Sequence, residues 1–459
     1  MASNRNRRRW ILWWVGLAVA ATAAMTAASE PQDQGPEAES RASFGRSRRA
    51  DDPRRPPGHH PGDRHGPGDG QIAEGRRTFR YDTFGDEAFW GGALRLHETV
   101  ATLGPEQVLG LGLKVDSEAL TPHFKQKLRH GRVDLADPAV TLDLLRMNAV
   151  VGVTGFFSND GKRLRSFGVQ CALCHSVVDD SLAPGIGRRL DGWANRDLNV
   201  GAIVAAAPSV EPFAAVLGTD EETVRTVLNS WGPGKFDAQL ILDGKAFRPD
   251  GKPGASLIPP AFGMAGVDVA TSTAWGTVTY WNAFVAVLEM HGQGRFQDDR
   301  MRDPVQFPVA AANGFFDVRS RVDRVTPKLA ELRAYQFSLP APSPPRGSFD
   351  GPAAARGSVL FGGRARCATC HAPPSFTDAD RRLHTPAEIG IDDFQSNRSP
   401  TFRYRTAPLR GLWTHARGGY YHDGRFSTLE AVVRHYDGHF RLGLAPGEVA
   451  DLVEYLKSL

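Results

Sequence analysis

Cysteine and histidine residues in two short repeats offer the clearest chemistry in this sequence. The repeats are Cys171-Ala-Leu-Cys174-His175 and Cys367-Ala-Thr-Cys370-His371. Two cysteines three positions apart on one helical turn can form thioether bonds to neighbouring vinyl groups of a porphyrin, and the histidine that follows can bind the iron. Both repeats therefore predict covalent attachment of a c-type haem, with His175 and His371 as iron ligands.

Zinc sites and redox dithiols also use pairs of cysteines at this spacing, so both remain alternatives. A structural zinc site normally has four ligands, whereas each repeat ends in a histidine and matches the haem pattern completely. The chain has four cysteines, and the two repeats use all of them. We therefore expect two covalently bound haem c groups, held by Cys171, Cys174, Cys367 and Cys370.

Composition is that of a globular protein with room for two cores. The chain has 459 residues, of which 41% are hydrophobic and 23% charged. Its formal net charge of +4 is small for this length, and much of the arginine lies in the amino-terminal tail. A nucleic-acid-binding face is therefore not predicted.

The amino terminus has the pattern of an export signal. Arginines at positions 5 and 7–9 precede an apolar run over residues 10–25, which ends in small residues at 26–29. This pattern predicts a signal peptide over residues 1–29, and an uncleaved membrane anchor is the alternative. Both place the body of the protein outside the cytoplasm, in the periplasm, where haem c is attached. The membrane is a partner only if the segment stays uncleaved.

Residues 30–75 are rich in proline, glycine, arginine and aspartate, with few large apolar side chains, and predict a disordered linker. A proline-rich boundary at 340–345 separates a first domain, residues 76–339, from a second, residues 346–459. We expect a mainly α fold of two cytochrome c-like haem domains, the first enlarged by a long insertion. Helices are expected near residues 94–100, 142–153 (leading toward the first repeat), 212–231, 328–337, 353–361 and 446–459.

Aromatic residues are dense between positions 259 and 296. Phe284, Val287, Leu288 and His291 recur at helical spacing, which is more often ordinary core than a cofactor pocket. Trp281 is the residue of this segment that could lie beside a haem and support hole transfer.

Three carboxy-terminal stretches carry a family resemblance: residues 405–412 (RTAPLRGL), residues 421–426 (YHDGRF), and residues 428–436, which end in His435 and Tyr436. Together with the order of the two repeats, they resemble the bacterial di-haem cytochrome c peroxidase and MauG superfamily. The aromatic segment with Tyr280, Trp281 and Phe296 is more similar to the di-haem rubber oxygenases, which makes Trp281 and Phe296 the candidate catalytic residues. The resemblance implies one reactive haem and one haem that relays electrons.

The resemblance also implies a sixth ligand to the second haem, which the peroxidases supply as a methionine before the terminal helix. No methionine follows Met301 here. Counting back from the terminal helix places His435 at this position, and Tyr436 ranks second because the MauG branch uses tyrosine. A solvated turn is the alternative for both. The family's Ca²⁺ site between the haems is also implied, but no residue can be assigned to it.

Other residues are candidates for the reactive haem and its surroundings. The peroxidase family's amino-terminal distal motif is not evident, which puts classical peroxidase activity in doubt. Glu289 and Gln239 are possible distal acid–base groups, although each is more easily explained as a surface side chain. Arg410 and Arg425 are expected to pair with haem propionates, because a guanidinium matches a carboxylate in a fixed fork, or else to be surface charges.

Three functions follow from these residues. The first is an exported di-haem oxidoreductase that activates peroxide or dioxygen at the haem of His175 and relays electrons through the haem of His371. Its partners would be a small oxidant and a small electron-donor protein or quinol-linked cytochrome. The second is an electron carrier with both irons six-coordinate, the first through Met264, Met290 or His291. The third is an oxygenase that cleaves an apolar, polyisoprene-like substrate.

Overall fold

The structure is a computed structural model that describes residues 68–459, so the predicted signal peptide and most of the predicted linker lie outside the described residues. The α-helices are α1 (Asp69–Tyr81), α2 (Leu96–Val100), α3 (Pro105–Gly110), α4 (Pro122–Arg129), α5 (Pro138–Arg146), α6 (Ala172–His175), α7 (Val200–Ala205), α8 (Glu211–Leu217), α9 (Glu221–Ser230), α10 (Leu240–Asp243), α11 (Val278–Phe284), α12 (Pro308–Asn313), α13 (Leu329–Ser338), α14 (Gly351–Gly362), α15 (Pro386–Ile389), α16 (Phe394–Asn397), α17 (Leu429–Phe440) and α18 (Pro446–Lys457).

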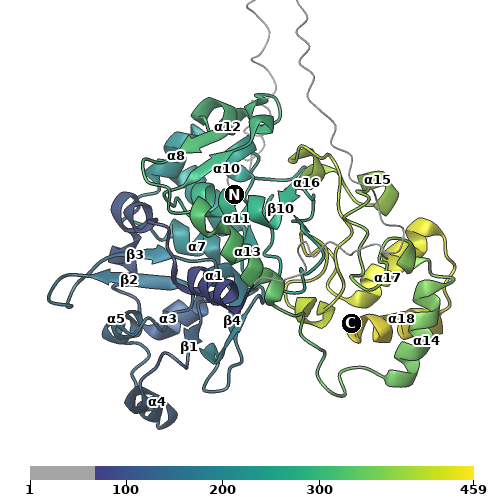
Figure 1. Ribbon diagram of the computed structural model, residues 1–459, viewed down its shortest axis with the longest axis horizontal. Coiled ribbons are helices and arrows are strands. Elements are labelled where there is room, and N and C mark those ends of the chain that lie inside the picture. The colour runs from purple at the N-terminus through teal and green to yellow at the C-terminus, as the bar shows by residue number, and fades with distance from the viewer. Residues whose placement is uncertain (1–67) are drawn as a thin grey trace, which may run out of the picture. The chain divides into compact units, whose positions relative to one another are not determined.

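Strands are short and form two-stranded sheets only, within residues 68–459. The pairs are β1 (Val115–Asp116) with β5 (Ile186–Gly187), β2 (Val153–Phe157) with β3 (Leu164–Val169), β4 (Ser176–Val178) with β6 (Arg189–Asp191), β7 (Lys235–Phe236) with β8 (Ser256–Leu257), β9 (Val269–Ala270) with β10 (Gly276–Thr277), and β11 (Arg295–Gln297) with β12 (Asp317–Arg319). Helices dominate, as Figure 1 shows, which confirms the predicted mainly α class. The two cytochrome c-like domains stay a prediction.

Regular structure begins earlier than the sequence predicts. Helix α1 starts at Asp69, inside the segment expected to be linker up to residue 75. It packs on α13, and the two backbones approach so closely that a Cβ at Gly75 would lie 1.9 Å from the carbonyl oxygen of Glu331. The prediction failed because the buried face of α1 consists of Gly75, Thr78 and Phe79, of which only Phe79 is a large apolar residue.

A β-hairpin, not a helix, leads into the first cysteine repeat. Helix α5 ends at Arg146, and the antiparallel pair β2–β3 follows, with Val153 opposite Val169. The helix expected over residues 142–153 is therefore wrong beyond Arg146. The β-branched residues Val150, Val151 and Val153 favour extended backbone there.

Aromatic side chains of the first half pack around α11. Phe284 is fully buried, and its ring centroid lies 4.8 Å from that of Trp281 and 5.4 Å from that of Phe296. The helix continues into a π-helical turn, η2 (Val285–Glu289), and ends before His291, which has φ +61°. The predicted helical spacing over this segment is confirmed as far as Glu289.

The carboxy-terminal helices form a hydrophobic core of their own. Helix α14 packs along α18, and α17 also contacts α18, as Figure 1 shows in green and yellow. Val449, Leu452 and Leu456 of α18 are buried, as predicted, and Val453 is partly buried against the same core. The helices expected near residues 328–337, 353–361 and 446–459 are confirmed as α13, α14 and α18, and that near 212–231 is split into α8 and α9.

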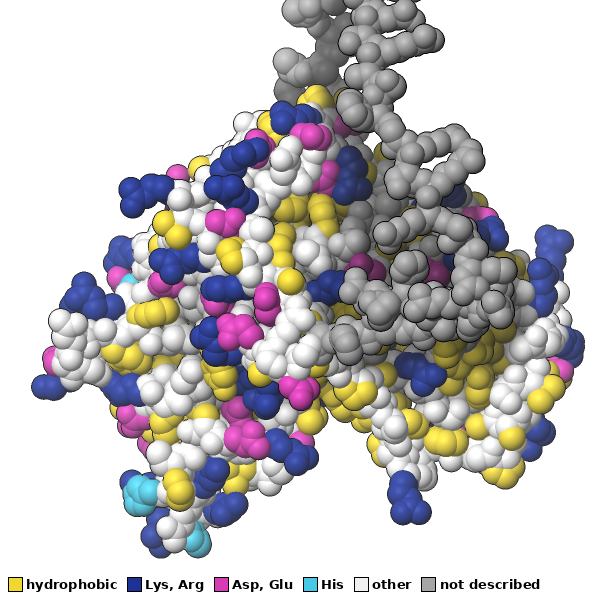
Figure 2. Space-filling view, viewed as in Figure 1, with side chains coloured by type: hydrophobic (Ala, Val, Ile, Leu, Met, Phe, Trp, Pro, Cys, Tyr) yellow, Lys and Arg dark blue, Asp and Glu magenta, His cyan; other side chains and the backbone are white. Residues whose placement is uncertain are grey.

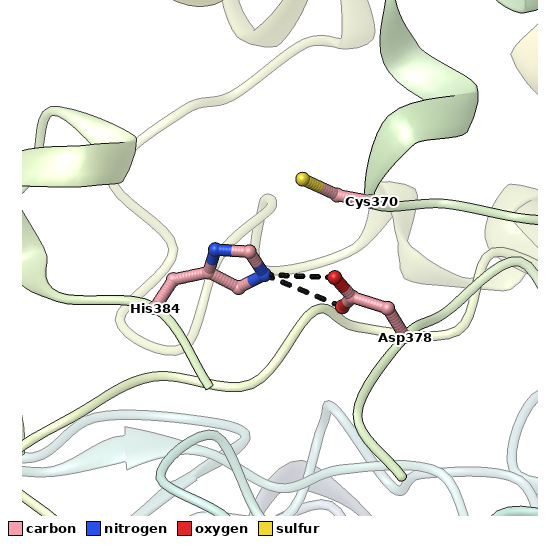
Figure 3. A group of neighbouring side chains, drawn as sticks. All are labelled: Cys370, Asp378 and His384. Atoms are coloured by element: carbon pink, nitrogen blue, oxygen red, sulfur yellow. Dashed lines mark hydrogen bonds and ion pairs between the residues drawn. The ribbon is translucent and has the colours of Figure 1, made fainter. Parts of the chain in front are cut away.

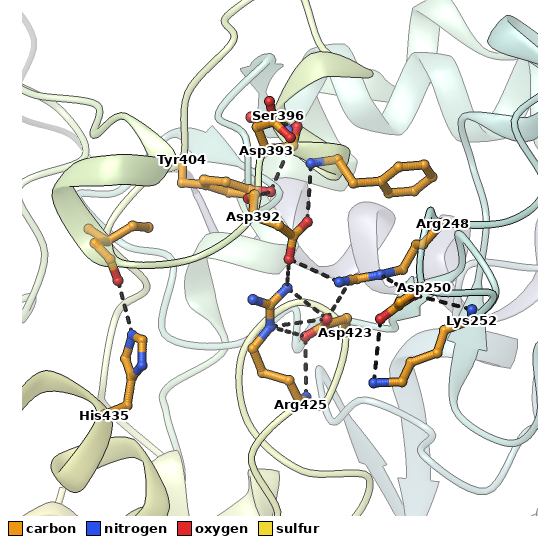
Figure 4. Close-up of polar contacts among 12 residues, drawn as sticks. Arg248, Asp250, Lys252, Asp392, Asp393, Ser396, Tyr404, Asp423, Arg425 and His435 are labelled. Atoms are coloured by element: carbon orange, nitrogen blue, oxygen red, sulfur yellow. Dashed lines mark hydrogen bonds and ion pairs between the residues drawn. The ribbon is translucent and has the colours of Figure 1, made fainter. Parts of the chain in front are cut away.

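An ion-pair cluster joins segments from the two sides of the proline-rich boundary. The guanidinium of Arg398 has no exposed surface; its Nε lies 2.7 Å from Asp243 and its Nη2 lies 2.9 Å from Asp237. Nearby, Arg248 pairs with Asp392 and Asp423, and Arg425 pairs with the same two carboxylates (Figure 4). Residues His65–Leu459 form one compact unit, and its division into two haem domains stays a prediction.

Surface charge is mixed on the face shown in Figure 2, where lysine and arginine side chains are interspersed with aspartate and glutamate. Among the residues described, no helix combines the length and the apolar character needed to cross a membrane.

Candidate functional site

The first repeat folds as the predicted helical turn. Helix α6 covers Ala172–His175, and the backbone N–H of His175 donates to the carbonyl of Cys171 at 3.1 Å. On the imidazole, Nδ1 lies 3.0 Å from the carbonyl oxygen of Pro259. A carbonyl only accepts, so Nδ1 carries the proton and Nε2 keeps its lone pair for a metal. Burial lowers the pKa of His175 to about 4, which keeps the ring neutral at pH 7.

The second repeat reaches the same geometry in a different local setting. It lies in a 3₁₀ turn, η5 (Cys367–Thr369), and the N–H of His371 donates to the carbonyl of Cys367 at 2.9 Å. Nδ1 of His371 lies 3.0 Å from the carbonyl oxygen of Phe376, and burial lowers the pKa of the ring. Histidines that bind metals through Nε2 are commonly held by this kind of Nδ1–H bond. Both repeats therefore fit covalent haem with a proximal histidine.

The thiols do not have the environment of a redox dithiol. Reactive cysteines have lowered pKa values, usually beside cationic groups or helix amino termini. Here burial raises the pKa of Cys171 and Cys174 to about 12 and that of Cys367 to about 11. The surroundings of the sulfurs are thus poor in polar groups, which suits the edge of a porphyrin.

A possible metal-binding group lies beside the second repeat. Nε2 of His384 faces both carboxylate oxygens of Asp378, at 3.1 and 3.3 Å, and the sulfur of Cys370 is close by (Figure 3). The three ligand atoms lie within 4.8 Å of one another. A structural zinc site would normally need a fourth ligand and a thiolate, and thioether formation at Cys370 would consume the thiolate. Neither Cys367 nor His371 belongs to this group.

The two candidates for the sixth ligand of the second haem lie next to each other on α17 but face different neighbours. His435 has its Nε2 3.1 Å from the carbonyl oxygen of Ile389, so this nitrogen is already bonded to the backbone (Figure 4). Burial raises the pKa of Tyr436, an interaction with Tyr421 lowers it, and the charges of Cys370 and Cys367 raise it. The choice between His435 and Tyr436 as the sixth ligand stays a prediction.

The two arginines expected to pair with propionates have partners already. Arg425 donates to Asp423 and Asp392 and shares both carboxylates with Arg248 (Figure 4). Arg410 is exposed, and its Nε donates to the carbonyl of Pro374 at 2.7 Å. Their propionate roles stay predictions, and the positive charge of Arg425 is largely matched.

The candidate catalytic residues Trp281 and Phe296 belong to the same aromatic core. Phe296 packs edge-to-face on Tyr280 and Phe284, with centroid distances of 5.4 Å in both cases. Trp281 is 8% exposed, and its Nε1 is buried with no hydrogen-bond partner among the described residues. Their catalytic roles stay predictions.

Glu289 and Gln239, explained above as surface side chains, are buried at their polar ends, so that explanation is wrong. Gln239 is 6% exposed, and its Oε1 accepts from Gln395 at 2.9 Å. Oε1 of Glu289 is buried without a partner, and burial, followed by the charge of Asp237, raises the pKa of Glu289 well above its usual range. The surroundings of Glu289 therefore favour the protonated form of its carboxyl.

Sequence reasoning missed several buried polar residues because they lie outside any recognisable spacing. Nε2 of His415, Nε2 of His422, and two guanidinium nitrogens of Arg196 are buried without hydrogen-bond partners in the described part of the chain. Only the sequence stretch around His422 gave a hint, through the family resemblance. Such unpartnered groups are rare in folded proteins and commonly mark a bound group.

Part of the chain is similar to a curated protein. No family model matches the chain. A segment of 122 residues is 37% identical to the methylamine utilization protein MauG of Methylorubrum extorquens, covering 23% of this chain and 34% of MauG. The match thus spans about a third of that relative's length.

Three solved structures show some likeness to the chain, all with low TM-scores. A hydrazine synthase of Kuenenia stuttgartiensis is 25% identical over 34% of this chain and 60% of that one, with a TM-score of 0.22. A MauG-like protein associated with microbial copper homeostasis is 18% identical over 48% and 76%, with a TM-score of 0.30. A variant of the di-haem peroxidase BthA from Burkholderia thailandensis is 16% identical over 85% and 86%, with a TM-score of 0.24. Scores this low carry no argument about architecture.

Proposed function

We propose that the chain belongs to the di-haem cytochrome c peroxidase and MauG superfamily, as its 37% identity to MauG over 122 residues supports, and that it is an exported di-haem c-type cytochrome that activates peroxide or dioxygen at its first haem. The second haem would relay electrons between the first and an electron-donor protein. Export is inferred from the amino-terminal sequence pattern.

One observation carries the proposal: both repeat histidines donate Nδ1–H to a backbone carbonyl and keep Nε2 free. The distances are 3.0 Å at His175 and 3.0 Å at His371, although the two turns and their carbonyl partners differ. When bound, each haem would supply an iron that exchanges electrons and, where a position is open, binds a small oxidant. Cys171 and Cys174 would hold the first haem, and Cys367 and Cys370 the second.

Tyr436 is the residue we propose as the sixth ligand of the second haem. The proposal is supported by the charges of Cys370 and Cys367, which act on the pKa of the phenol, and by the Nε2 of His435, which bonds to the backbone. A sixth protein ligand leaves no position for an oxidant, which suits a relay. The first repeat would then hold the reactive haem.

Glu289 is the acid–base group we propose for the reactive side. Burial raises the pKa of its carboxyl well above the usual range, and its Oε1 has no partner among the described residues. A buried carboxylic acid can deliver a proton to an oxygen atom of a bound oxidant and take it back. Gln239 and Asp237 lie in the same buried region, since the N–H of Gln239 donates to Asp237 at 3.1 Å and the charge of Asp237 acts on Glu289.

The test begins with protein matured in a host that attaches haem. Its intact mass should exceed that of the bare chain by two haems, and a Cys171→Ala, Cys174→Ala double variant should carry one. The EPR spectrum of the oxidised protein should contain a high-spin ferric component that the double variant lacks. A mass equal to the bare chain would refute the haem sites. Two haems without any high-spin component, oxidised or half-reduced, would instead support the electron carrier.

A further inference from the structure

A buried arginine follows the first repeat and has no partner for much of its guanidinium. Arg196 is 9% exposed, and its Nε and Nη1 are buried without hydrogen-bond partners among residues 68–459. The neighbouring N–H of Asn195 donates to the carbonyl of Cys174 at 2.8 Å, which ties this arginine to the first repeat. Burial also lowers the pKa of Arg196 to about 10.

The carboxylate closest to Arg196 in the sequence is already neutralised by other cations. Asp197 pairs with Lys114 at 2.6 Å and also with Arg417. An isolated charge held away from water is strongly unfavourable, and folded proteins pair such charges or bind a counter-ion. The guanidinium of Arg196 therefore requires an anion that the described residues do not supply.

A second unpartnered group, on the carboxy-terminal side of the proline-rich boundary, is close enough to be affected by the charge of Arg196. Nε2 of His415 is buried without a partner, and the charge of Arg196 contributes to lowering the pKa of this ring. The segment after His415 approaches the arginine closely at Gly418, where φ is +82° and an added Cβ would lie 3.4 Å from Nη1 of Arg196 and 3.1 Å from Cδ2 of Leu257. The guanidinium of Arg196 and the neutral imidazole of His415 are thus two unsatisfied groups on segments that meet here.

We propose that Arg196 and His415 form a carboxylate-binding site that holds a propionate of the first haem. The inference rests on the proposed function, because the propionate reaches this place only if a haem is attached at Cys171 and Cys174. A guanidinium binds carboxylates through charge-assisted N–H donors, and Nε and Nη1 of Arg196 are two such donors without a partner among the described residues. In contrast to Arg425, whose charge two aspartates share, Arg196 has its charge available.

The experiment measures the midpoint potential of each haem in a redox titration. Arg196→Gln removes a positive charge beside the first haem, so it should lower the potential of that haem and leave the second unchanged. Arg196→Lys keeps the positive charge but lacks the planar guanidinium, so it should lower the potential of the first haem by less than Arg196→Gln does. Arg188→Gln is the matched control: this arginine also follows the first repeat, but it pairs with Asp179, has 66% of its side chain exposed, and should shift neither potential.

Resonance Raman spectra provide a second readout that does not depend on folding of the glutamine variant. The propionate bending mode of the first haem should shift between wild type and Arg196→Lys or His415→Gln. Unchanged potentials and an unchanged Raman mode in variants with two haems would overturn the site while leaving the proposed function intact. A wild-type potential that depends on added acetate would also overturn it, because a free anion would then occupy the site. Wild-type protein without haem fails the proposed function itself.

Discussion

Two adjacent residues on α17 are the candidates for the sixth ligand of the second haem. Successive side chains of an α-helix point about 100° apart, so His435 and Tyr436 differ in their polar surroundings. Nε2 of His435 lies 3.1 Å from the carbonyl oxygen of Ile389, whereas burial raises the pKa of Tyr436 and the charges of Cys370 and Cys367 add to the rise. Counting from the terminal helix pointed to both residues but could not choose between them.

Replacement of Tyr436 by phenylalanine should remove the sixth ligand of the second haem. The expected result is a low-spin to high-spin change of that haem in EPR and optical spectra, with both haems still attached. His435→Gln is the matched control and should keep the low-spin signal, because its Nε2 bonds to the backbone. If His435→Gln loses the low-spin signal and Tyr436→Phe keeps it, the sixth ligand is His435 instead.

Glu289→Gln keeps the shape of the side chain but removes its acidic proton. A general acid–base group typically increases a reaction rate by roughly 10²–10⁴-fold, so the reaction of the variant with peroxide should be slower by roughly 100-fold or more. Because burial raises the pKa of Glu289, the wild-type rate should fall as pH rises through that pKa, and the variant should lack this fall. Stopped-flow absorbance at several pH values measures both.

A control for this variant is Glu98→Gln, an exposed glutamate paired with Arg95 at 2.8 Å. It should leave the peroxide rate unchanged. Equal rates for wild type and Glu289→Gln, in protein with two haems, would remove Glu289 from the proposed chemistry.

At the scale of elements, the β2–β3 hairpin positions the first repeat through a buried carboxyl. Asp86 has no exposed surface and accepts from the N–H of Val169, the last residue of β3, at 3.2 Å. Two residues later the chain reaches Cys171. Burial raises the pKa of Asp86 to about 9, so the folded protein holds this group protonated at neutral pH.

The raised pKa of Asp86 makes the stability of this region depend on pH. An unfolded aspartate ionises near pH 4, roughly, so the stabilisation is fully present below that pH and is lost as pH rises through about 9. Asp86→Asn lacks this ionisation, so its free energy of unfolding should fall less than that of wild type between pH 5 and 9. Denaturant unfolding at these two pH values is the measurement.

Asp160 provides the control, because it lies exposed in the turn of the same hairpin. Hydrogen bonds from Ser158 and Lys162 lower its pKa, so it stays ionised from pH 5 to 9. Asp160→Asn should therefore leave the pH dependence of unfolding unchanged. A wild-type slope identical to that of Asp86→Asn would show that Asp86 does not contribute it.

Helices with a row of apolar side chains on one face could be predicted from the sequence. Helices that pack through close backbone contacts could not. Helix α18 was expected from Val449, Leu452 and Leu456, and the repeats fixed their own helical turns. Helix α1 was missed because its packing depends on Gly75, which lets two backbones approach. Arg196 was missed, and Glu289 was wrongly explained as a surface side chain. A charged residue gives no sign of burial in the sequence when its neighbours come from distant segments.

At the scale of the whole molecule, one buried arginine connects the two sides of the proline-rich boundary. Arg398, at the end of α16, reaches Asp243 of α10 and Asp237 just before it, and none of the three side chains is exposed. Its Nη1 also donates to the carbonyl of Gly254 at 3.3 Å. The two carboxylates would repel each other without the cation, so the connection depends on Arg398.

Arg398→Met should destabilise the whole protein, because it leaves Asp237 and Asp243 buried and uncompensated. Breaking one partner of a buried ion pair costs about 3–5 kcal/mol, and the free energy of unfolding should fall by that order. Arg356→Met is the matched control: Arg356 pairs with Asp451 at 2.6 Å with 61% of its side chain exposed, and such surface pairs contribute about 0–1 kcal/mol. Denaturant unfolding followed by circular dichroism and by haem absorbance would measure both variants.

Arg398 also connects the segments before and after the proline-rich boundary. In Arg398→Met, the unfolding transition seen by circular dichroism should therefore no longer coincide with that seen by haem absorbance, since the two haem regions would unfold independently. Equal losses for Arg398→Met and Arg356→Met would contradict this role.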